Sequence, residues 1–169
     1  DDAGRRAAIV EDARRAGADY AAVGVDVVFL SANMSPEHPR VHHAAVGARA
    51  DPDRLAVLAE IAGEVGAAMR AEGVRAALHP HVGSWIETGP EARFVLDHTD
   101  PADLGFGPDI GHLAWTGTDV VAWVAAHADR ISDLHVKDMD LALAAAAREK
   151  QTPYFDVMAQ RFFLEPGLG

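Results

Sequence analysis

The stretch ADLGFGPD, residues 102–109, is a short apolar segment that ends on a carboxylate. Two further stretches also end on polar side chains, VRAALHPH at residues 74–81 and RISDLHVKD at residues 130–138. A fourth apolar run, DYAAVGVDVVFL, precedes them at residues 19–30. Short apolar runs of this kind are typical of strands that are buried on both faces of a parallel sheet. The four stretches therefore predict an α/β fold with parallel strands and crossover helices.

Helical periodicity fills the intervals between these predicted strands. Thr88 and Glu91 form the T-x-x-E pattern of a capping box, and Asp51 precedes a proline at a second helix start. Gly17 and Gly73 are the expected ends of the first two helices. The predicted helices cover about residues 4–16, 51–73, 91–98, 118–127 and 141–150. Residues 31–50 are expected to form a long loop, and no low-complexity linker divides the chain, so we expect one domain over residues 1–169.

The composition excludes several classes of protein. The formal net charge of -11 disfavours binding to nucleic acid, because no basic stripe offsets it. The absence of cysteine excludes disulfides, thiolate metal sites and cysteine nucleophiles. No apolar run reaches the ~18 residues of a membrane span, and the start of the chain lacks the apolar core of a signal peptide. The expectation is a soluble cytoplasmic protein with no nucleic-acid or membrane partner.

Polar side chains follow three of the predicted strands. His79 and His81 end one strand, Asp109 ends the next, and His135 and Lys137 end the last. Both architectures built on parallel strands, the open sheet and the barrel, place active sites at the carboxyl edge of the strands. No G-x-G-x-x-G sequence follows a strand, which disfavours a dinucleotide site. These side chains are therefore candidates for one site at a common edge.

Carboxylate oxygen and neutral imidazole suit a divalent ion such as Mn²⁺, Co²⁺, Mg²⁺ or Zn²⁺. Asp109 and His135 are candidates for one ligand each, and His112, three residues after Asp109, is expected to face the same cavity. An ion held there would polarise a substrate carbonyl and acidify the adjacent C–H bond.

Each of these residues also has a structural interpretation. Asp109 could cap the turn that follows it, and His135 could be a core histidine. Asp138 is expected to be a helix N-cap, with Lys137 paired to it or to Asp133. Trp85 and Trp115 follow polar strand ends and could form aromatic walls. Three loop histidines are expected to be solvated, namely His38, His42 and His43.

Three segments carry a resemblance to a known family: LHPHVGSWIET (78–88), DHTDPADLGFGPDIGHLAWTGTD (97–119) and DRISDLHVKDMD (129–140). Together they resemble the xylose isomerase-like TIM barrel superfamily of sugar isomerases and epimerases, and within it the inosose dehydratase group. The resemblance runs from Arg5 to Gly167. The D-x-G-H and H-x-K-D motifs are specific for the superfamily but not for a substrate.

The resemblance implies a (β/α)8 barrel with one divalent metal ion, usually held by two glutamates, an aspartate and a histidine. Asp109 resembles the aspartate ligand and His135 the histidine ligand, and His112 resembles a substrate-contacting residue. The first glutamate would fall at His79. Its role is assigned to Glu87 by preference, with His79 or His81 as replacements.

The second glutamate normally ends the last strand, which lies beyond Gly169, and Glu165 matches a loop motif rather than this ligand. A complete barrel takes ~250 residues, so the 169 residues are expected to form a partial barrel that lacks its first two strands and its last one. Unpaired sheet edges would then need cover, either from the missing parts or from a homo-oligomer.

The resemblance favours an aldose–ketose isomerase, epimerase or dehydratase that acts on a small sugar or inositol derivative, with the H-P-H-V-G-S run favouring inosose dehydratase. His81 or Lys137 could supply the acid that a dehydratase needs. The alternatives are a non-catalytic barrel remnant and an endonuclease-type phosphodiesterase, and the acidic charge disfavours the second.

Overall fold

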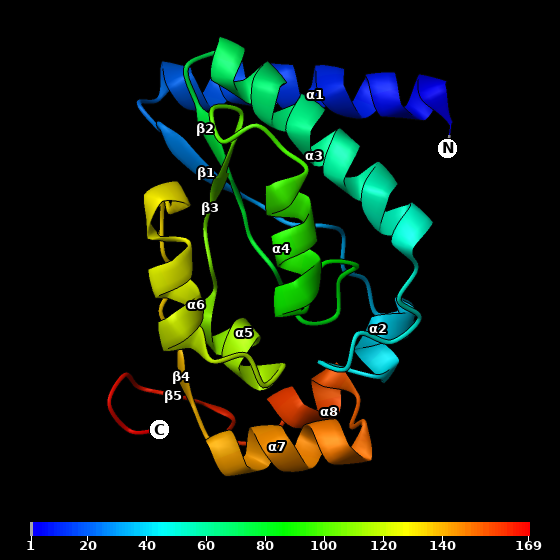
Figure 1. Cartoon of the computed structure of the whole chain (residues 1–169), viewed down its shortest axis with the longest axis vertical. Coiled ribbons are helices and arrows are strands. Elements are labelled where there is room, and N and C mark those ends of the chain that lie inside the picture. Colours follow the sequence, from blue (N-terminus) through cyan, green and yellow to red (C-terminus); the bar gives the residue numbers. More distant parts are fainter. Residues whose placement is uncertain (1) are drawn as a thin grey trace.

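The computed structural model describes residues 2–169. Its helices are α1 Ala3–Ala22, α2 Pro39–His42, α3 Pro52–Ala71, α4 Gly89–Asp97, α5 Ile110–Trp115, α6 Val120–Ala126, α7 Leu141–Lys150 and α8 Tyr154–Met158, with a 3-10 turn at Ala128–Arg130. Its strands are β1 Val27–Leu30, β2 Arg75–Leu78, β3 Leu104–Phe106, β4 Asp138–Met139 and β5 Phe163–Leu164. Figure 1 shows their arrangement.

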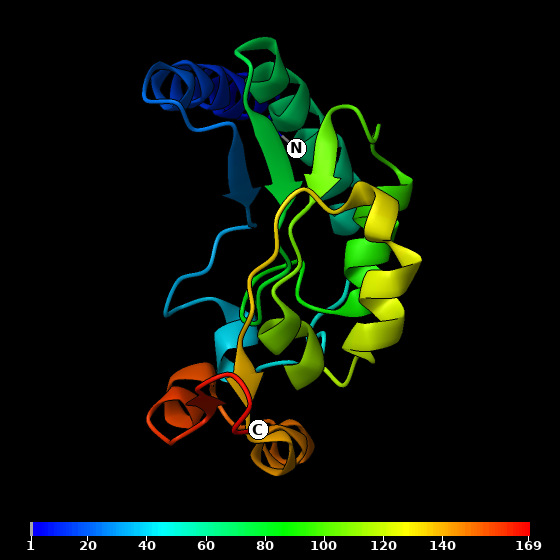
Figure 2. The ribbon, with the colours of Figure 1, turned by 90° about the vertical axis from the view of Figure 1, so that its left-hand side faces the viewer.

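The predicted parallel sheet is present. Strands β1, β2 and β3 pair in that order, all parallel, with Leu30 opposite Leu78 and Leu78 opposite Phe106. The next segment of chain continues the parallel order through single bridges from Phe106 to Ile131 and from Asp109 to His135. Figure 2 shows the three strands running in one direction, toward the end of the molecule that holds α5, α7 and α8. The carboxyl edge of the sheet is therefore where the polar strand ends gather.

The main core lies between this sheet and the crossover helices. Leu78, Leu104 and Phe106 of the sheet are buried together with Val65 of α3 and Val95 of α4. A second buried cluster, which includes Trp115, Met139, Val157 and Phe162, joins α5, α7 and α8 below the carboxyl edge. Both clusters hold the strand ends in place from opposite sides.

Helix α1 is longer than predicted. It packs along α3 (Figure 1) and is joined to it by ion pairs from Arg6 to Glu60 and Glu64. Gly17 does not end the helix: a Cβ atom at this position would lie 3.3 Å from the Met69 Cα atom and from the Glu72 Cβ atom of α3. Gly17 is thus a point of close helix approach, and residues 19–22 are helical rather than part of a strand.

Two other expectations about chain segments are wrong. Residues 31–50 include the short helix α2, capped by His38, and His38 is only 8% exposed rather than solvated. Residues 130–138 do not form one continuous strand, because they make only isolated bridges, to Phe106 of β3 and to Asp109, before β4 pairs antiparallel with β5.

Asp138 is not a helix N-cap, since Asp140 caps α7. Its carboxylate instead accepts hydrogen bonds from the backbone N–H groups of Met139, Gly167 and Gly169, and these bonds lower its pKa. Asp138 therefore ties the end of the described chain to β4, which directly follows Lys137.

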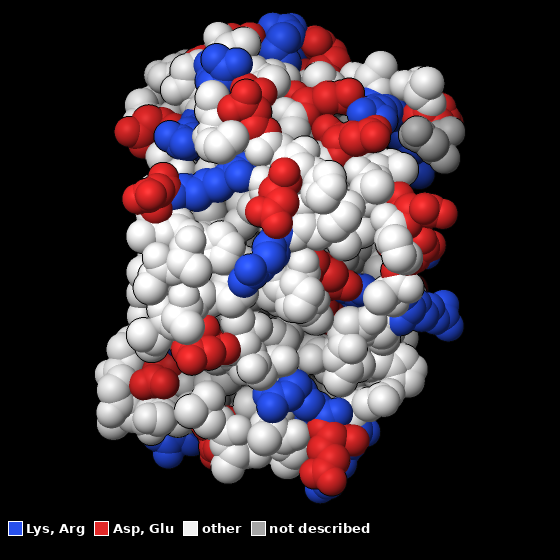
Figure 3. All heavy atoms as spheres, in the orientation of Figure 1, with Lys and Arg blue, Asp and Glu red and all other residues white. Residues whose placement is uncertain are grey.

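Between residues 2 and 169, none of the helices is both long and apolar enough to cross a bilayer. On the face drawn in Figure 3, acidic and basic side chains are interspersed rather than gathered into a single basic stripe.

Candidate metal centre

Asp109 is the centre of the site and is fully buried, with 0% exposure. It is the N-cap of α5, because its Oδ1 atom accepts a hydrogen bond from the backbone N–H of His112 at 3.0 Å. The predicted cap at Asp109 is therefore present. The cap fixes the carboxylate plane and leaves Oδ2 directed at the other polar strand ends.

His79 follows β2 and is held in one tautomer. Its Nδ1 atom lies 2.8 Å from the carbonyl oxygen of Gly107, and a carbonyl can only accept, so Nδ1 carries the proton. Nε2 then has a free lone pair, 3.8 Å from Asp109 Oδ2. Burial lowers the pKa of His79, which keeps the imidazole neutral. A neutral imidazole oriented by a backbone carbonyl is the usual form of a metal-binding histidine.

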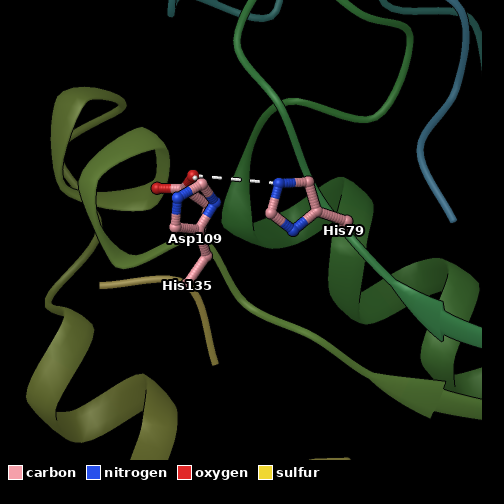
Figure 4. Close-up of side chains that lie close together, drawn as sticks. All are labelled: His79, Asp109 and His135. Atoms are coloured by element: carbon pink, nitrogen blue, oxygen red, sulfur yellow. Dashed lines mark ion pairs between the residues drawn. The ribbon is translucent and has the colours of Figure 1, made fainter. Parts of the chain in front are cut away.

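His135 completes a group of three. Its Nδ1 atom lies 3.0 Å from Asp109 Oδ2, and the ligand atoms of His79, Asp109 and His135 all lie within 4.8 Å of one another. Figure 4 shows the His135 imidazole overlapping the Asp109 carboxylate in this view, with His79 to one side and its ion-pair contact to Asp109 dashed. Two nitrogen donors and one oxygen donor fit a divalent transition ion. These three residues could therefore hold the predicted metal ion.

Lys137 contacts the same carboxylate. Its Nζ atom lies 2.7 Å from Asp109 Oδ2 and 3.2 Å from His112 Nε2, so the expected pairing with Asp133 or Asp138 is wrong. Asp109 is the stronger partner because its charge is fully buried and needs compensation.

His112 and His81 lie beside this group, with His112 Nε2 3.9 Å from Asp109 Oδ2. Their ring centroids are 3.7 Å apart, and burial lowers the pKa of both residues, that of His112 well below its ordinary value. The Nδ1 proton of His81 bonds the carbonyl oxygen of Val82 at 2.8 Å, which leaves Nε2 as a basic lone pair. The Nδ1 atom of His112 is buried without a partner among residues 2–169. His81, His112 and Lys137 are thus brought together, as predicted.

Glu87 is held elsewhere. Its carboxylate is fully buried and accepts hydrogen bonds from the backbone N–H groups of Gly47 at 2.7 Å and Gly83 at 2.9 Å. Arg40 Nε lies 4.0 Å from it. Glu87 is not part of the group around Asp109, whereas His79 is. The geometry thus favours His79 as the ligand at the position of the first glutamate.

Other features of the site carried no recognised signal in the sequence. The Phe29 ring of β1 lies over His79, with ring centroids 4.5 Å apart, and a Cβ atom at Gly107 would meet this ring at 2.6 Å. Trp115 is fully buried and belongs to the core rather than to an aromatic wall. Its neighbour Tyr154, from α8, lies near His81 and His112.

A family model described as the xylose isomerase-like TIM barrel matches residues 1–159. The chain belongs to this family. The predicted resemblance is confirmed, and with it an α/β fold of the TIM-barrel type.

Individual relatives of this xylose isomerase-like chain include dehydratases. The inosose dehydratase of Geobacillus thermodenitrificans is 30% identical over 98 residues, which are 58% of this chain and 33% of that protein. The rhizopine catabolism protein MocC of Rhizobium meliloti is 36% identical over 97 residues, which are 57% of this chain and 30% of that protein. The matched segments thus span about a third of these curated relatives.

Solved structures share the fold. The probable 3-DHS dehydratase AsbF of Bacillus anthracis superposes with a TM-score of 0.63 at 14% identity, over 78% of this chain and 44% of that one. A xylose isomerase-like TIM barrel protein of Mycobacterium smegmatis, in complex with magnesium, gives 0.59 at 20% identity, over 80% and 48%. The chain therefore spans about half the length of these structural relatives.

In this xylose isomerase-like chain, Glu87→Gln is expected to remove a pH dependence of stability. Burial raises the pKa of Glu87 from 4.5 to about 6, so protonation favours the folded state. The stability that Glu87 contributes is fully present below pH 4.5 and is lost as the pH rises through about 6. The shift corresponds to roughly 2 kcal/mol of unfolding free energy.

Urea unfolding at about pH 4.5 and about pH 7.5 measures this change, because any constant effect of the amide cancels in the difference. Glu165→Gln, at an exposed position, serves as the control. The Mn²⁺ affinity of Glu87→Gln should equal that of the unmodified protein. A loss of metal binding in this variant would return Glu87 to the ligand set.

Proposed function

We propose that this chain belongs to a divalent-metal-dependent enzyme that isomerises, epimerises or dehydrates a small sugar or cyclic polyol, most similarly to inosose dehydratase. The observation that carries the proposal is the convergence of neutral His79, His135 and buried Asp109 at the carboxyl edge of the sheet. The dehydratase names of the curated relatives support the substrate class.

His79, Asp109 and His135 would hold the ion, which would polarise a substrate carbonyl and its neighbouring hydroxyl group. His81 Nε2, whose pKa is lowered by burial, is available to remove the proton from the carbon beside the carbonyl. Its low proton affinity keeps it unprotonated at neutral pH, which a general base requires.

The fate of this proton distinguishes the three reactions. In an isomerisation it returns to the neighbouring carbon, and in an epimerisation a proton returns from the opposite face. In a dehydration, the Lys137 ammonium group protonates the departing hydroxide to form water, and the proton that His81 took from the substrate restores the ammonium group. Lys137 is held for this role by Asp109 and His112.

Lys137→Met is expected to abolish dehydration, because the acid is lost, and to raise the affinity for Mn²⁺ roughly 10-fold or more, because an ammonium group 2.7 Å from Asp109 Oδ2 repels a second cation. Calorimetric titration with Mn²⁺ measures the affinity. Lys150→Met removes the same charge at an exposed end of α7 and should change neither quantity.

Turnover is best followed by NMR in D2O, with an inosose and Mn²⁺ in the complete enzyme. All three reactions begin by removing the proton beside the carbonyl, so its replacement by deuterium reports the shared step before the product is known. Exchange by the unmodified protein, by Lys150→Met and by Lys137→Met, with dehydration absent from Lys137→Met alone, supports the proposal. If the protein binds the metal ion but exchanges no proton of an inosose or of simple ketoses for deuterium, it is a non-catalytic barrel.

A further inference from the structure

Tyr154 approaches the candidate site from a part of the chain that the predicted strands do not include. It begins the short helix α8, and its ring centroid lies 6.1 Å from that of His81 and 6.4 Å from that of His112. The rings of Tyr154 and His112 are nearly parallel, at 18°. The side chain therefore lies beside the two histidines that flank the metal group.

The core fixes one side of the Tyr154 ring. Trp115, which is fully buried, lies 5.5 Å from it by ring centroids, and Val157 of the same helix is buried in the same cluster. Tyr154 itself remains partly exposed, and within residues 2–169 its hydroxyl group has no hydrogen-bond partner. The ring is thus anchored against the core while part of the side chain stays accessible.

The phenol is kept protonated. Burial and the negative charge of Asp109 both raise the pKa of Tyr154 above its ordinary value of 10.0. A neutral phenol can donate one hydrogen bond and accept another. Among His79, His81 and His112, all with lowered pKa values, Tyr154 adds a hydroxyl group that neither titrates near neutral pH nor competes as a base.

We propose that the Tyr154 hydroxyl group binds a ring hydroxyl of the substrate and orients the reacting carbon toward His81. The inference rests on the proposed function for its substrate class, a hydroxyl-rich cyclic polyol. It adds a substrate-contacting residue from α8 to a site otherwise built from strand ends. Its expected contribution is to substrate binding rather than to proton transfer.

Tyr154→Phe isolates the hydroxyl group, because phenylalanine keeps the ring contacts to Trp115, His81 and His112. We expect KM for an inosose to rise about 3- to 10-fold, the usual range for one lost neutral hydrogen bond, with kcat changed less than about 3-fold. Mn²⁺ affinity and thermal stability should be unchanged. Tyr20→Phe makes the same chemical change on α1, where Tyr20 is 42% exposed, and should alter none of these quantities.

A second measurement does not depend on turnover. The chain has two tyrosines, so replacement by 3-fluorotyrosine gives two ¹⁹F resonances, which Tyr20→Phe assigns. Mn²⁺ should broaden the Tyr154 resonance strongly and the Tyr20 resonance little. In the Mg²⁺-loaded protein, an inosose or myo-inositol should shift the Tyr154 resonance alone.

The outcomes separate this inference from the proposed function. A polyol-induced shift of the Tyr154 resonance without any proton exchange would support the Tyr154 contact and contradict the catalytic proposal. Absence of a shift with both polyols, or an unchanged KM in Tyr154→Phe alongside active unmodified enzyme, would overturn the role of Tyr154.

Discussion

Asp109→Asn is expected to lower the affinity for Mn²⁺ by at least about 100-fold, because changes outside the ligand shell already cost 10- to 100-fold and this change removes the charged ligand itself. Asp109 Oδ2 faces His79 Nε2 and His135 Nδ1, and no other carboxylate belongs to the group that the described residues form. Calorimetric titration of the purified variants with Mn²⁺ measures the loss.

The Asp109→Asn variant is expected to keep the native fold, so its metal affinity can be measured. Its side-chain oxygen can still accept the hydrogen bond from the His112 N–H that caps α5. Asp133→Asn is the matched control, because Asp133 lies two residues from His135 but is exposed. Undiminished Mn²⁺ affinity in Asp109→Asn, with native circular dichroism, would remove Asp109 from the metal site.

Arg40→Met is expected to lower the free energy of unfolding by roughly 3–5 kcal/mol, the usual cost of breaking a buried ion pair from one side. Arg40 is 1% exposed and forms two hydrogen bonds with the Glu91 carboxylate, at 2.9 and 2.5 Å. It also donates to the carbonyl oxygens of Ala48 and Ser84. Methionine fills a similar volume but leaves these acceptors and the nearby Glu87 uncompensated.

Urea unfolding at pH 7.5 measures this loss. Arg54→Met is the control: the Arg54 guanidinium lies 3.9 Å from the centroid of the Trp85 ring, but its side chain is 37% exposed, so about 1 kcal/mol or less is expected. Equal losses in the two variants would contradict the assignment of Arg40 to a stabilising buried ion pair with Glu91.

The elements that could be predicted from the sequence are those with local signals. Helix α3 begins after the Asp51 cap, α4 begins with the Thr88 capping box, and α7 covers the predicted residues. The polar strand ends were predictable as one site because the carboxyl ends of parallel strands share an edge.

Tertiary contacts decided the rest of the fold. Gly17 is a helix-ending residue in isolation, yet the packing of α1 on α3 carries the helix past it. The segment around His135 has the composition of a strand, but it pairs through isolated bridges. Local sequence cannot reveal either outcome, because the deciding partners are distant in the chain.

Several details of the site also depend on contacts between residues that are distant in the sequence. The tautomer of His79 depends on the carbonyl of Gly107, 28 residues away. Lys137 pairs with Asp109 rather than with Asp133 or Asp138, which are nearer in the sequence. Glu87 had a plausible role at the metal, but the amides of Gly47 and Gly83 hold its carboxylate elsewhere. Tyr154 is recognisable only from its ring contacts, since its sequence neighbours form no recognised motif.

The most direct test of the metal centre is the position of a bound ion in crystals of the complete protein grown with Zn²⁺, located by anomalous scattering. We predict a peak about 2.0–2.2 Å from His79 Nε2, from Asp109 Oδ2 and from a ring nitrogen of His135. A peak beside the Glu87 carboxylate, or none at these three side chains in a fully loaded crystal, would contradict the account.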